Sequence, residues 1–333
     1  MHLLEVALSG ILLSRQHTIQ QGRQIMHSPH QRDAHPQPIC SRRIFLGSAL
    51  AASATVVAGA LAGCQRPSTL EVVQPTTGGG RDDLSDSVIG KDKIRIGMEA
   101  AYAPYNWQVS EASEYTIPID NVQGAYADGY DVQIAKIVCK ALGGEPVAVK
   151  QSFSGLIDSL NNGQIDLIIA GMSATDERRQ SVDFSDPYFV GYFGLFVKEG
   201  SKYENATKLS DFSGAQVLGQ KDTMLDTVID EIPGVIHQAP VDSVPNVFSH
   251  LLQGTCDAVT YNTENEEGYM KQNPGIVPVR FAEGEGFQQD VTCNVGMRKG
   301  STKLLDIINE VVDGVSEDER SAMWQACLDR QPE

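Results

Sequence analysis

SLNNGQIDLIIAGM at residues 159–172 and LLQGTCDAVTYN at residues 251–262 share one pattern. In each, a helical segment ends at a glycine, an aspartate follows within a few residues, and an apolar strand comes next. Two lobes built on the same plan would produce this repeat. Since ligands in open α/β sheets bind beyond the carboxyl ends of the strands, both strand ends are candidate site positions.

Strand and helix patterns alternate from residue 93 onward. KIRIGME (93–99) and PVAVKQ (146–151) read as strands, and residues 130–144 have helical spacing that ends at glycines. A further strand, helix and strand follow over residues 215–239, and two helical patterns close the chain. This alternation predicts an α/β fold with mostly parallel sheets flanked by helices.

The charge balance is acidic, with 26 basic and 43 acidic residues in a chain of 333 and a formal net charge of −17. Such a chain is long enough for one large domain or two of ordinary size. Because phosphate binding requires a basic surface, we expect no nucleic acid partner.

The cysteines and histidines indicate neither a metal site nor a histidine-based catalytic triad. The cysteines after residue 64 lack CxxC spacing, so we expect no zinc. They are either free thiols or disulfide-bonded, and a bridge would first be sought among Cys139, Cys293 and Cys327, with Cys256 as the fourth thiol. After residue 63 only His237 and His250 remain.

The N-terminal segment SRRIFLGSALAASATVVAGALAGC (41–64) has paired arginines, then an apolar stretch, then small residues before a cysteine. This order predicts an export signal over residues 1–63. SRRIFL resembles a twin-arginine signal and LAGC a lipobox, which would make Cys64 the lipidated first residue of the mature chain. The alternatives are a transmembrane helix or a plain secretory signal. Translation starts at Met1 or at Met26.

Residues 64–92 mix Pro, Thr, Gly and Asp with few apolar residues. Such a segment buries too little surface to fold alone. We expect it to tether the folded part to a lipid anchor on the outer face of the cytoplasmic membrane.

The end of the first repeated strand offers groups for a small anion or zwitterion. Carbonyls at Ala170, Gly171 and Met172 can accept from an ammonium group, and the Ser173 hydroxyl can donate to a carboxylate. A helix beginning near residue 175 adds a positive dipole end, and Arg178 presents a planar fork that matches a carboxylate. The alternative is a capped helix start with Arg178 as a solvated charge.

Aromatic residues upstream are the next candidates. AYAPYNW (101–107) follows the first strand, so Tyr102 can line an apolar cleft, as can Phe153 at a strand-to-helix junction. Core packing is the alternative for both. Glu99 ends the first strand, which turns its charge toward the same cleft.

YAPYNW, GYDVQIAKIVCKALG, QSFSGLIDSLNNGQIDLIIAGMSATDERRQSVDFSDPY and VGMRKGSTKLLDIIN resemble the bacterial extracellular amino-acid-binding proteins of ABC importers. The resemblance covers roughly residues 93–330. It implies a type II periplasmic-binding-protein fold, a two-lobe clamp that closes on its ligand. We expect lobe 1 to comprise 93–192 and 287–333 and lobe 2 to comprise 193–286, with crossings near 190–195 and 283–288.

The resemblance also implies roles for the candidate residues. Arg178 would pair with the α-carboxylate of an amino acid, helped by the Ser173 hydroxyl and backbone N–H. The carbonyls at Ala170 and Gly171 would take the α-ammonium. Tyr102 and Phe153 would enclose the aliphatic part of the ligand.

In lobe 2 the sequence departs from the family pattern. Thr223 matches a hydroxyl position, but Asp222 stands where the family usually has glycine. Asn262 stands where the family usually has an acidic residue that pairs with the ammonium, and Glu264 is the alternative partner if its loop folds inward.

These features predict a lipoprotein that binds an amino acid and delivers it to an ABC permease, without a cofactor and without catalysing a reaction. A carboxylate at Glu99 inclines the expected ligand toward a cationic or polar amino acid. The alternatives are a sensor domain that reports the ligand to a signalling partner, or a dehydratase on the same scaffold.

Overall fold

The computed structural model describes residues 86–332, all of which belong to one unit, Gln74–Glu333. The predicted export signal (1–63), the predicted lipidation at Cys64 and the tether up to residue 85 lie outside the described residues. No helix within residues 86–332 is long and apolar enough to span a membrane.

Within the described residues, nine strands form one mixed sheet in the order β10-β9-β11-β8-β13-β7-β1-β6, with β12 paired to β8. The strands are β1 (Lys93–Met98), β6 (Glu145–Lys150), β7 (Leu167–Ile168), β8 (Val182–Lys198), β9 (Gln216–Leu218), β10 (Ile236–His237), β11 (Ala258–Asn262), β12 (Ile276–Pro278) and β13 (Asp290–Arg298). The helices are α3 (Tyr130–Leu142), α4 (Leu156–Asn161), α5 (Asp176–Ser181), α6 (Met224–Thr227), α7 (Val244–Gln253), α8 (Glu266–Gln272), α9 (Thr302–Gly314) and α10 (Glu317–Arg330).

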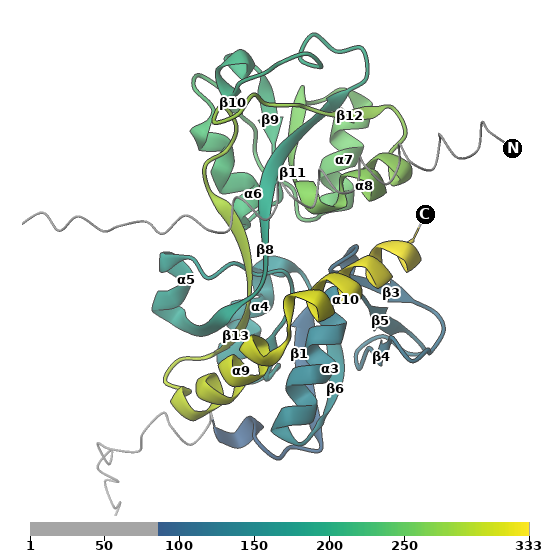
Figure 1. Cartoon of the computed structure of the whole chain (residues 1–333), viewed down its shortest axis with the longest axis vertical. Coiled ribbons are helices and arrows are strands. Elements are labelled where there is room, and N and C mark those ends of the chain that lie inside the picture. Colours follow the sequence, from purple (N-terminus) through teal and green to yellow (C-terminus); the bar gives the residue numbers. More distant parts are fainter. Residues whose placement is uncertain (1–85, 333) are drawn as a thin grey trace, which may run out of the picture. The chain divides into compact units, whose positions relative to one another are not determined.

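The sheet belongs to two lobes because β8 changes partner along its length. Its first part, up to Tyr192, pairs with β13, and its last part, from Phe193, pairs with β11 and β12. In Figure 1, β8 runs from the group of elements around β1, β6 and α3 into the group around β9, β11 and α7. The predicted α/β fold with two lobes is confirmed.

The expectation of mostly parallel sheets needs correction. The three strands at each end of the sheet are parallel to each other. At one end β6 and β7 pair with β1, and at the other β10 and β11 pair with β9. The strands β8 and β13 pair antiparallel with each other and with their neighbours. They do so because they carry the chain into lobe 2 and back.

The repeated aspartate has the same task in both lobes. The Oδ2 of Asp166 accepts from the backbone N–H of Arg95 at 2.9 Å, and the Oδ2 of Asp257 accepts from the N–H of Gln216 at 2.8 Å. Each carboxylate thus satisfies a donor of the neighbouring strand just before its own strand begins. Asp166 also pairs with the guanidinium of Arg95 and the ammonium of Lys91.

Residues 101–128 hold a second sheet that the sequence pattern did not predict. In the described part of the chain it has four short antiparallel strands in the order β2-β3-β5-β4. These are β2 (Ala101–Tyr102), β3 (Asn106–Val109), β4 (Ile117–Pro118) and β5 (Tyr126–Asp128). Strands of two to four residues are too short for an alternating pattern to be visible.

Three predicted elements have different extents. The strand expected over 164–171 narrows to β7, and the helix expected over 223–232 becomes α6 followed by the 3-10 turn Val228–Glu231. The strand expected at 191–200 begins much earlier, at Val182, directly after α5. The early start follows from β13, which pairs with β8 from Val182 onward.

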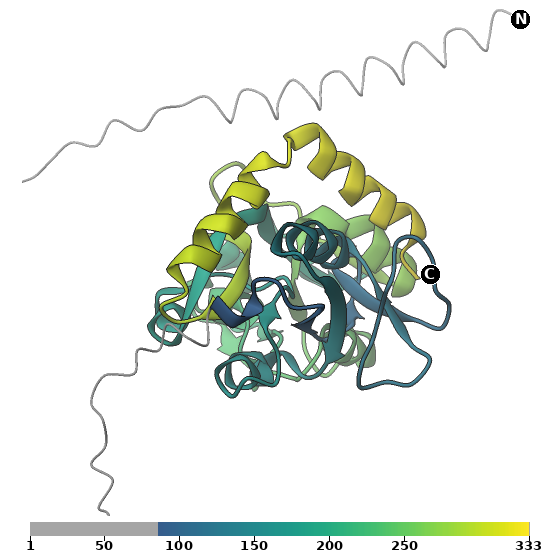
Figure 2. The same cartoon turned by 90° about the horizontal axis from the view of Figure 1, so that it is seen from below.

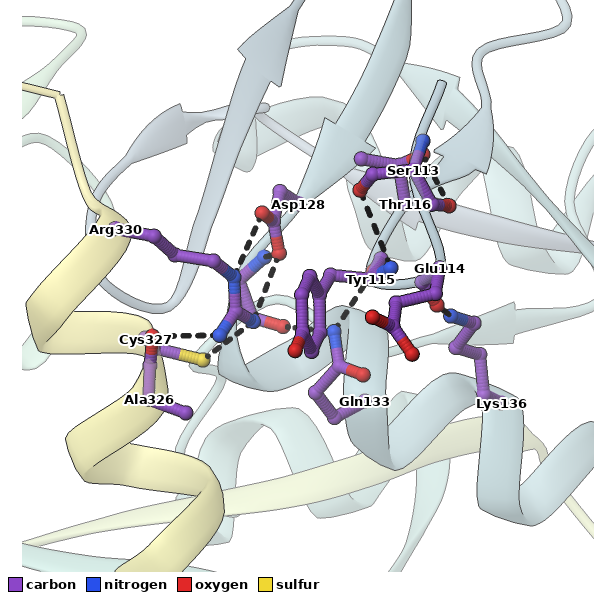
Figure 3. A network of polar contacts seen from close by, with 11 residues as sticks. Ser113, Glu114, Tyr115, Thr116, Asp128, Gln133, Lys136, Ala326, Cys327 and Arg330 are labelled. Carbon is purple, nitrogen blue, oxygen red and sulfur yellow. Dashed lines mark hydrogen bonds and ion pairs between the residues drawn. The ribbon is translucent and has the colours of Figure 1, made fainter. Parts of the chain in front are cut away.

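The helices α9 and α10 meet at a bend and cover the outside of lobe 1 (Figure 2), where both pack against α3. Figure 3 shows how the end of α10 is fixed. The guanidinium of Arg330 donates to both carboxylate oxygens of Asp128 on β5, at 2.8 and 3.0 Å, and lies over the ring of Tyr115. A bidentate pair of this kind is geometrically specific, and it joins α10 to the small sheet.

Candidate functional site

A small cavity lies where strand ends of the two lobes meet. Its volume is about 30 Å³, which is room for a water molecule or two. Its lining consists of Glu99, Tyr102, Phe153, Gly171, Ser173, Arg178, Phe193, Gln220, Thr223, Met224, Leu225, Asn262 and Val291. The structure therefore brings together all the predicted site residues except Ala170, which is buried behind the cavity, and Met172, which lines a larger outer pocket.

Arg178 lies between this cavity and the outer pocket. Its backbone N–H donates to the Thr175 hydroxyl, which caps α5 as expected for a helix starting near residue 175. Its guanidinium donates to the carbonyls of Ser173 in lobe 1, at 2.7 Å, and Asp222 in lobe 2, at 2.6 Å. It is thus held between the lobes and is not a solvated surface charge.

The ring of Phe153 supports the same guanidinium, with 5.2 Å between the ring centroid and the Cζ of Arg178. This is a cation–π contact. Burial lowers the pKa of Arg178 to about 10, which leaves the side chain protonated at neutral pH. The site therefore presents a rigid positive charge with its planar face packed.

The strand end at Gly171 has a conformation that requires its glycine. Its φ is +63°, and a Cβ there would lie 3.2 Å from the ring of Tyr102. The Gly171 N–H donates to the hydroxyl of Tyr188 at 3.2 Å, and the Met172 carbonyl accepts from the N–H of Asn294 at 2.9 Å. The turn is thus fixed from behind, and Gly171 and Ser173 face the cavity.

Glu99 is 8 % exposed and faces lobe 2 across the cavity. Both of its carboxylate oxygens lie 3.0 Å from the Nε2 of Gln220, which donates to them. Burial raises the pKa of Glu99 to about 7, and the bond from Gln220 acts in the opposite direction. Among the described residues that line the cavity, Glu99 is the only carboxylate and Arg178 the only cation.

Tyr102 and Asn262 also meet between the lobes. The Tyr102 hydroxyl donates to the Oδ1 of Asn262, and the Tyr102 ring stacks on Tyr105 with centroids 4.7 Å apart. Asn262 is 2 % exposed, and its Nδ2 has no hydrogen-bond partner within residues 86–332. The amide thus brings an unused donor to the position where the sequence departs from the family pattern.

Asp222 adopts the glycine-like backbone that its position calls for, with φ of +60°. The carbonyl that this turn presents is the one that Arg178 contacts. Thr223 lines the cavity, but its hydroxyl caps α6: it donates to the Gln220 carbonyl at 2.7 Å and accepts from the N–H of Leu225 at 3.1 Å.

Glu264 does not fold inward. Its Oε1 accepts from the backbone N–H of Tyr192 at 2.7 Å, where β8 passes from one lobe to the other. It lines a different pocket, beside α8 and the end of α10. The structure thus places Glu264 at the crossing between the lobes rather than in the cavity.

Gln220 is the cavity residue of clearest chemical importance that sequence reasoning missed. It is 2 % exposed and also donates to the carbonyl of Asp242 at 3.2 Å. The available signal was its place, since it comes two residues after the strand β9 in lobe 2, much as Glu99 comes directly after β1 in lobe 1.

The four cysteines within residues 86–332 are free and buried, which answers the question that the sequence left open for them. Within residues 86–332, no cluster of three or more His, Cys, Asp or Glu side chains is arranged to hold a metal ion. The chemistry of the cavity is that of hydrogen bonds, one guanidinium and one carboxylate.

A two-lobe α/β chain with oppositely charged groups facing one cavity between its lobes has the form of a binding protein for a small solute. Residues 94–325 match the family of bacterial extracellular solute-binding proteins, family 3, and the chain belongs to that family. The family is described as extracellular and solute-binding, and the relatives that follow are named as binding proteins.

Two curated relatives are similar over most of their length. One is the L-arginine-binding protein of Pseudomonas aeruginosa, 28% identical over 240 residues, which cover 70% of this chain and 86% of that protein. Another is the ABC transporter glutamine-binding protein GlnH of Bacillus subtilis, 30% identical over 205 residues, which cover 61% of this chain and 72% of that protein.

A solved relative has been described with two ligands. An ancestral arginine-binding protein, bound to arginine, is 28% identical with a TM-score of 0.58, and the match covers 71% of this chain and 98% of that one. The same protein bound to glutamine gives the same identity and TM-score.

Proposed function

We propose that this protein binds an amino acid between its lobes and delivers it to an ABC import permease. One observation carries the proposal: Arg178 and Glu99 are the single cation and the single carboxylate among the described residues that line one cavity. An amino acid whose carboxylate binds Arg178 and whose side chain offers Glu99 a cationic or polar group complements such a pair.

In this proposal the Arg178 fork binds the ligand carboxylate. To do so it exchanges its contacts with the Ser173 and Asp222 carbonyls for bonds to two carboxylate oxygens. The Ser173 hydroxyl and N–H assist it. The Ala170–Gly171 carbonyl region and the remaining lone pair of the Asn262 Oδ1 accept from the ammonium, and Tyr102 and Phe153 pack against the aliphatic part.

Glu99 faces the ligand side chain. Its burial beside Gln220 supports a cationic or polar ligand, because such a ligand supplies the hydrogen bonds that a buried carboxylate requires. The relatives named for arginine and for glutamine agree with this class.

Binding requires the lobes to separate, because a cavity of about 30 Å³ holds no amino acid. The lobes are joined by β8 at Tyr192 and by the segment before β13, which begins at Asp290. We propose lobe 1 over 93–192 and 287–333 and lobe 2 over 193–286, with closure by rotation about these crossings.

The proposal extends to the N-terminal segment. Export by a twin-arginine signal and lipidation of Cys64 would hold the protein at the outer face of the cytoplasmic membrane, near its permease. Replacing Cys64 by Ser is expected to shift the protein from the membrane fraction to the soluble extracytoplasmic fraction. An unchanged distribution would contradict lipidation.

The direct test of binding is a thermal-shift panel of the twenty common amino acids on the full chain, followed by calorimetric titration of those that raise Tm. Stabilisation by a cationic or polar amino acid is expected. If no amino acid shifts Tm and another solute does, the proposed ligand class is wrong.

A further inference from the structure

A buried carboxylate lies behind the wall of the cavity. Asp131, in the first turn of α3, is 0 % exposed and does not line the cavity. Its carboxylate accepts from the side chains of Tyr188 and Asn106, both of which are uncharged. A carboxylate buried in this way is costly unless its hydrogen bonds are satisfied, and the two side chains that satisfy them connect Asp131 to two turns of the cavity wall.

One branch leads to the strand end at Gly171. The Tyr188 hydroxyl donates to the Oδ1 of Asp131 at 2.7 Å and accepts from the Gly171 N–H at 3.2 Å. Gly171 has a φ of +63° and lines the cavity.

The other branch leads to the turn after Glu99. The Nδ2 of Asn106 donates to the Oδ2 of Asp131 at 2.8 Å, and the Oδ1 of Asn106 accepts from the Ala100 N–H at 2.8 Å. Ala100 has a φ of +50°, uncommon for a residue with a side chain, and it stands between Glu99 and Tyr102.

The direction of every bond in this network is fixed. The Tyr188 oxygen and the Asn106 Oδ1 each accept from a backbone N–H, so the Tyr188 hydroxyl hydrogen and one hydrogen of the Asn106 NH₂ group point at Asp131. An ionised carboxylate accepts both bonds. An asparagine at this position would set its own NH₂ against one of the two donors.

We propose that Asp131 is a positioning residue for the ligand site, which holds the 99–102 and 170–173 turns in place through Asn106 and Tyr188 without touching the ligand. The claim about the ligand rests on the proposed function, whereas the claim about the two turns does not. The experiment therefore has one arm without ligand and one with it.

The first arm measures hydrogen exchange by mass spectrometry on the full chain. Burial raises the pKa of Asp131 to about 7, so the measurement is made at pH 8, where the carboxylate is ionised. Asp131→Asn is expected to raise exchange about ten-fold in peptides covering 98–106 and 169–175, and to leave β11 in lobe 2 unchanged. Unchanged exchange in both peptides would overturn the proposal.

Asp166→Asn is the matched control. Asp166 is also a buried aspartate of lobe 1, 1 % exposed, but it pairs with Lys91 and Arg95 before β7 begins. Asp166→Asn is expected to leave hydrogen exchange in the two turns as it is in the unaltered protein. If it loosens them as much as Asp131→Asn does, the effect is general weakening of lobe 1 and the proposal fails.

Tyr188→Phe tests a single branch and serves if Asp131→Asn does not fold. It removes the hydroxyl between Asp131 and Gly171 and keeps the ring. Faster exchange in 169–175 alone is expected. Equal loosening of both turns, or of neither, would contradict the branched network.

The second arm titrates L-arginine, L-glutamine and L-histidine by calorimetry. Asp131→Asn is expected to weaken binding about ten-fold or more, which corresponds to one bond to a charged group. Unaltered affinity in that variant would overturn the positioning role. If the unaltered protein binds none of the three while exchange behaves as expected, the proposed ligand class fails and the role of Asp131 in ordering the turns stands.

Discussion

The Nε2 of Gln220 in lobe 2 donates to both carboxylate oxygens of Glu99 in lobe 1, at 3.0 Å each. The two residues are 121 positions apart in the chain and meet because β1 and β9 end at the same cavity. The partner of the buried carboxylate, Gln220, is uncharged. Arg178 is the only cation among the described residues that line the cavity. Burial therefore opposes the ionisation of Glu99.

Glu99 is expected to make stability depend on pH. Its folded pKa of about 7 exceeds the ordinary 4.5, so its proton favours the folded state. Its contribution is fully present below pH 4.5 and is lost as pH rises through 7. Between those limits the free energy of unfolding of Glu99→Gln, relative to the unaltered protein, is expected to rise by about 3 kcal/mol.

Urea unfolding of both proteins across this range measures the difference. Glu267→Gln, a substitution of an exposed glutamate on α8, is the control and is expected to show a constant difference. A constant difference for Glu99→Gln as well would show that Glu99 titrates normally.

Arg178→Ala is expected to abolish the rise in Tm that the ligand causes, because a buried carboxylate would lose its bidentate partner, at a cost of several kcal/mol. Arg179→Ala is the matched control, since Arg179 is the next residue of α5 and lies over the ring of Phe184, outside the cavity lining. It is expected to keep the ligand response. Equal responses from the two variants would contradict the assigned role of Arg178.

Asn262→Asp is expected to strengthen binding. The new carboxylate would still accept from the Tyr102 hydroxyl and would add a charge for the ligand ammonium. Affinity for the amino acid that gives the largest thermal shift is expected to rise about ten-fold, measured by calorimetry. Asn262→Leu, which removes both polar atoms, is expected to weaken it. Weaker binding by the aspartate variant would place the ammonium elsewhere.

Asp222→Gly and Asp222→Ala separate backbone from side chain. Since φ is +60° at this residue, alanine is expected to destabilise the protein by about 1 kcal/mol, and glycine by less. Thermal unfolding measures both. If alanine is tolerated as well as glycine, the left-handed turn is not required for the carbonyl that Arg178 contacts.

The sequence revealed those features in which neighbouring residues act on each other. The repeat around Asp166 and Asp257 was readable because each aspartate precedes its own strand, and α3 because Gly143, at φ +82°, ends it. Much of the predicted site was visible because its residues lie at or near strand ends, as Glu99 does after β1 and Asn262 at the end of β11.

The rest depended on contacts between distant segments. Gln220 gains its importance from Glu99, and Asp131 from Tyr188 and Asn106, which lie 57 and 25 positions away. The position of Glu264 depends on β8 passing beside it. No local spacing encodes such pairs, and the strands β2 to β5 are too short to show a period.

The place of β13 in the sheet has a consequence for the order of folding. β13, residues 290–298, lies between β7 and β8. During synthesis, by contrast, all the described strands that pair within lobe 2 are complete once the chain reaches residue 278. Lobe 2 can therefore complete its sheet first, while β7 and the first part of β8 wait for a partner from near the C-terminus. The sheet of lobe 1 is therefore completed last, although its first strand, β1, is synthesised first.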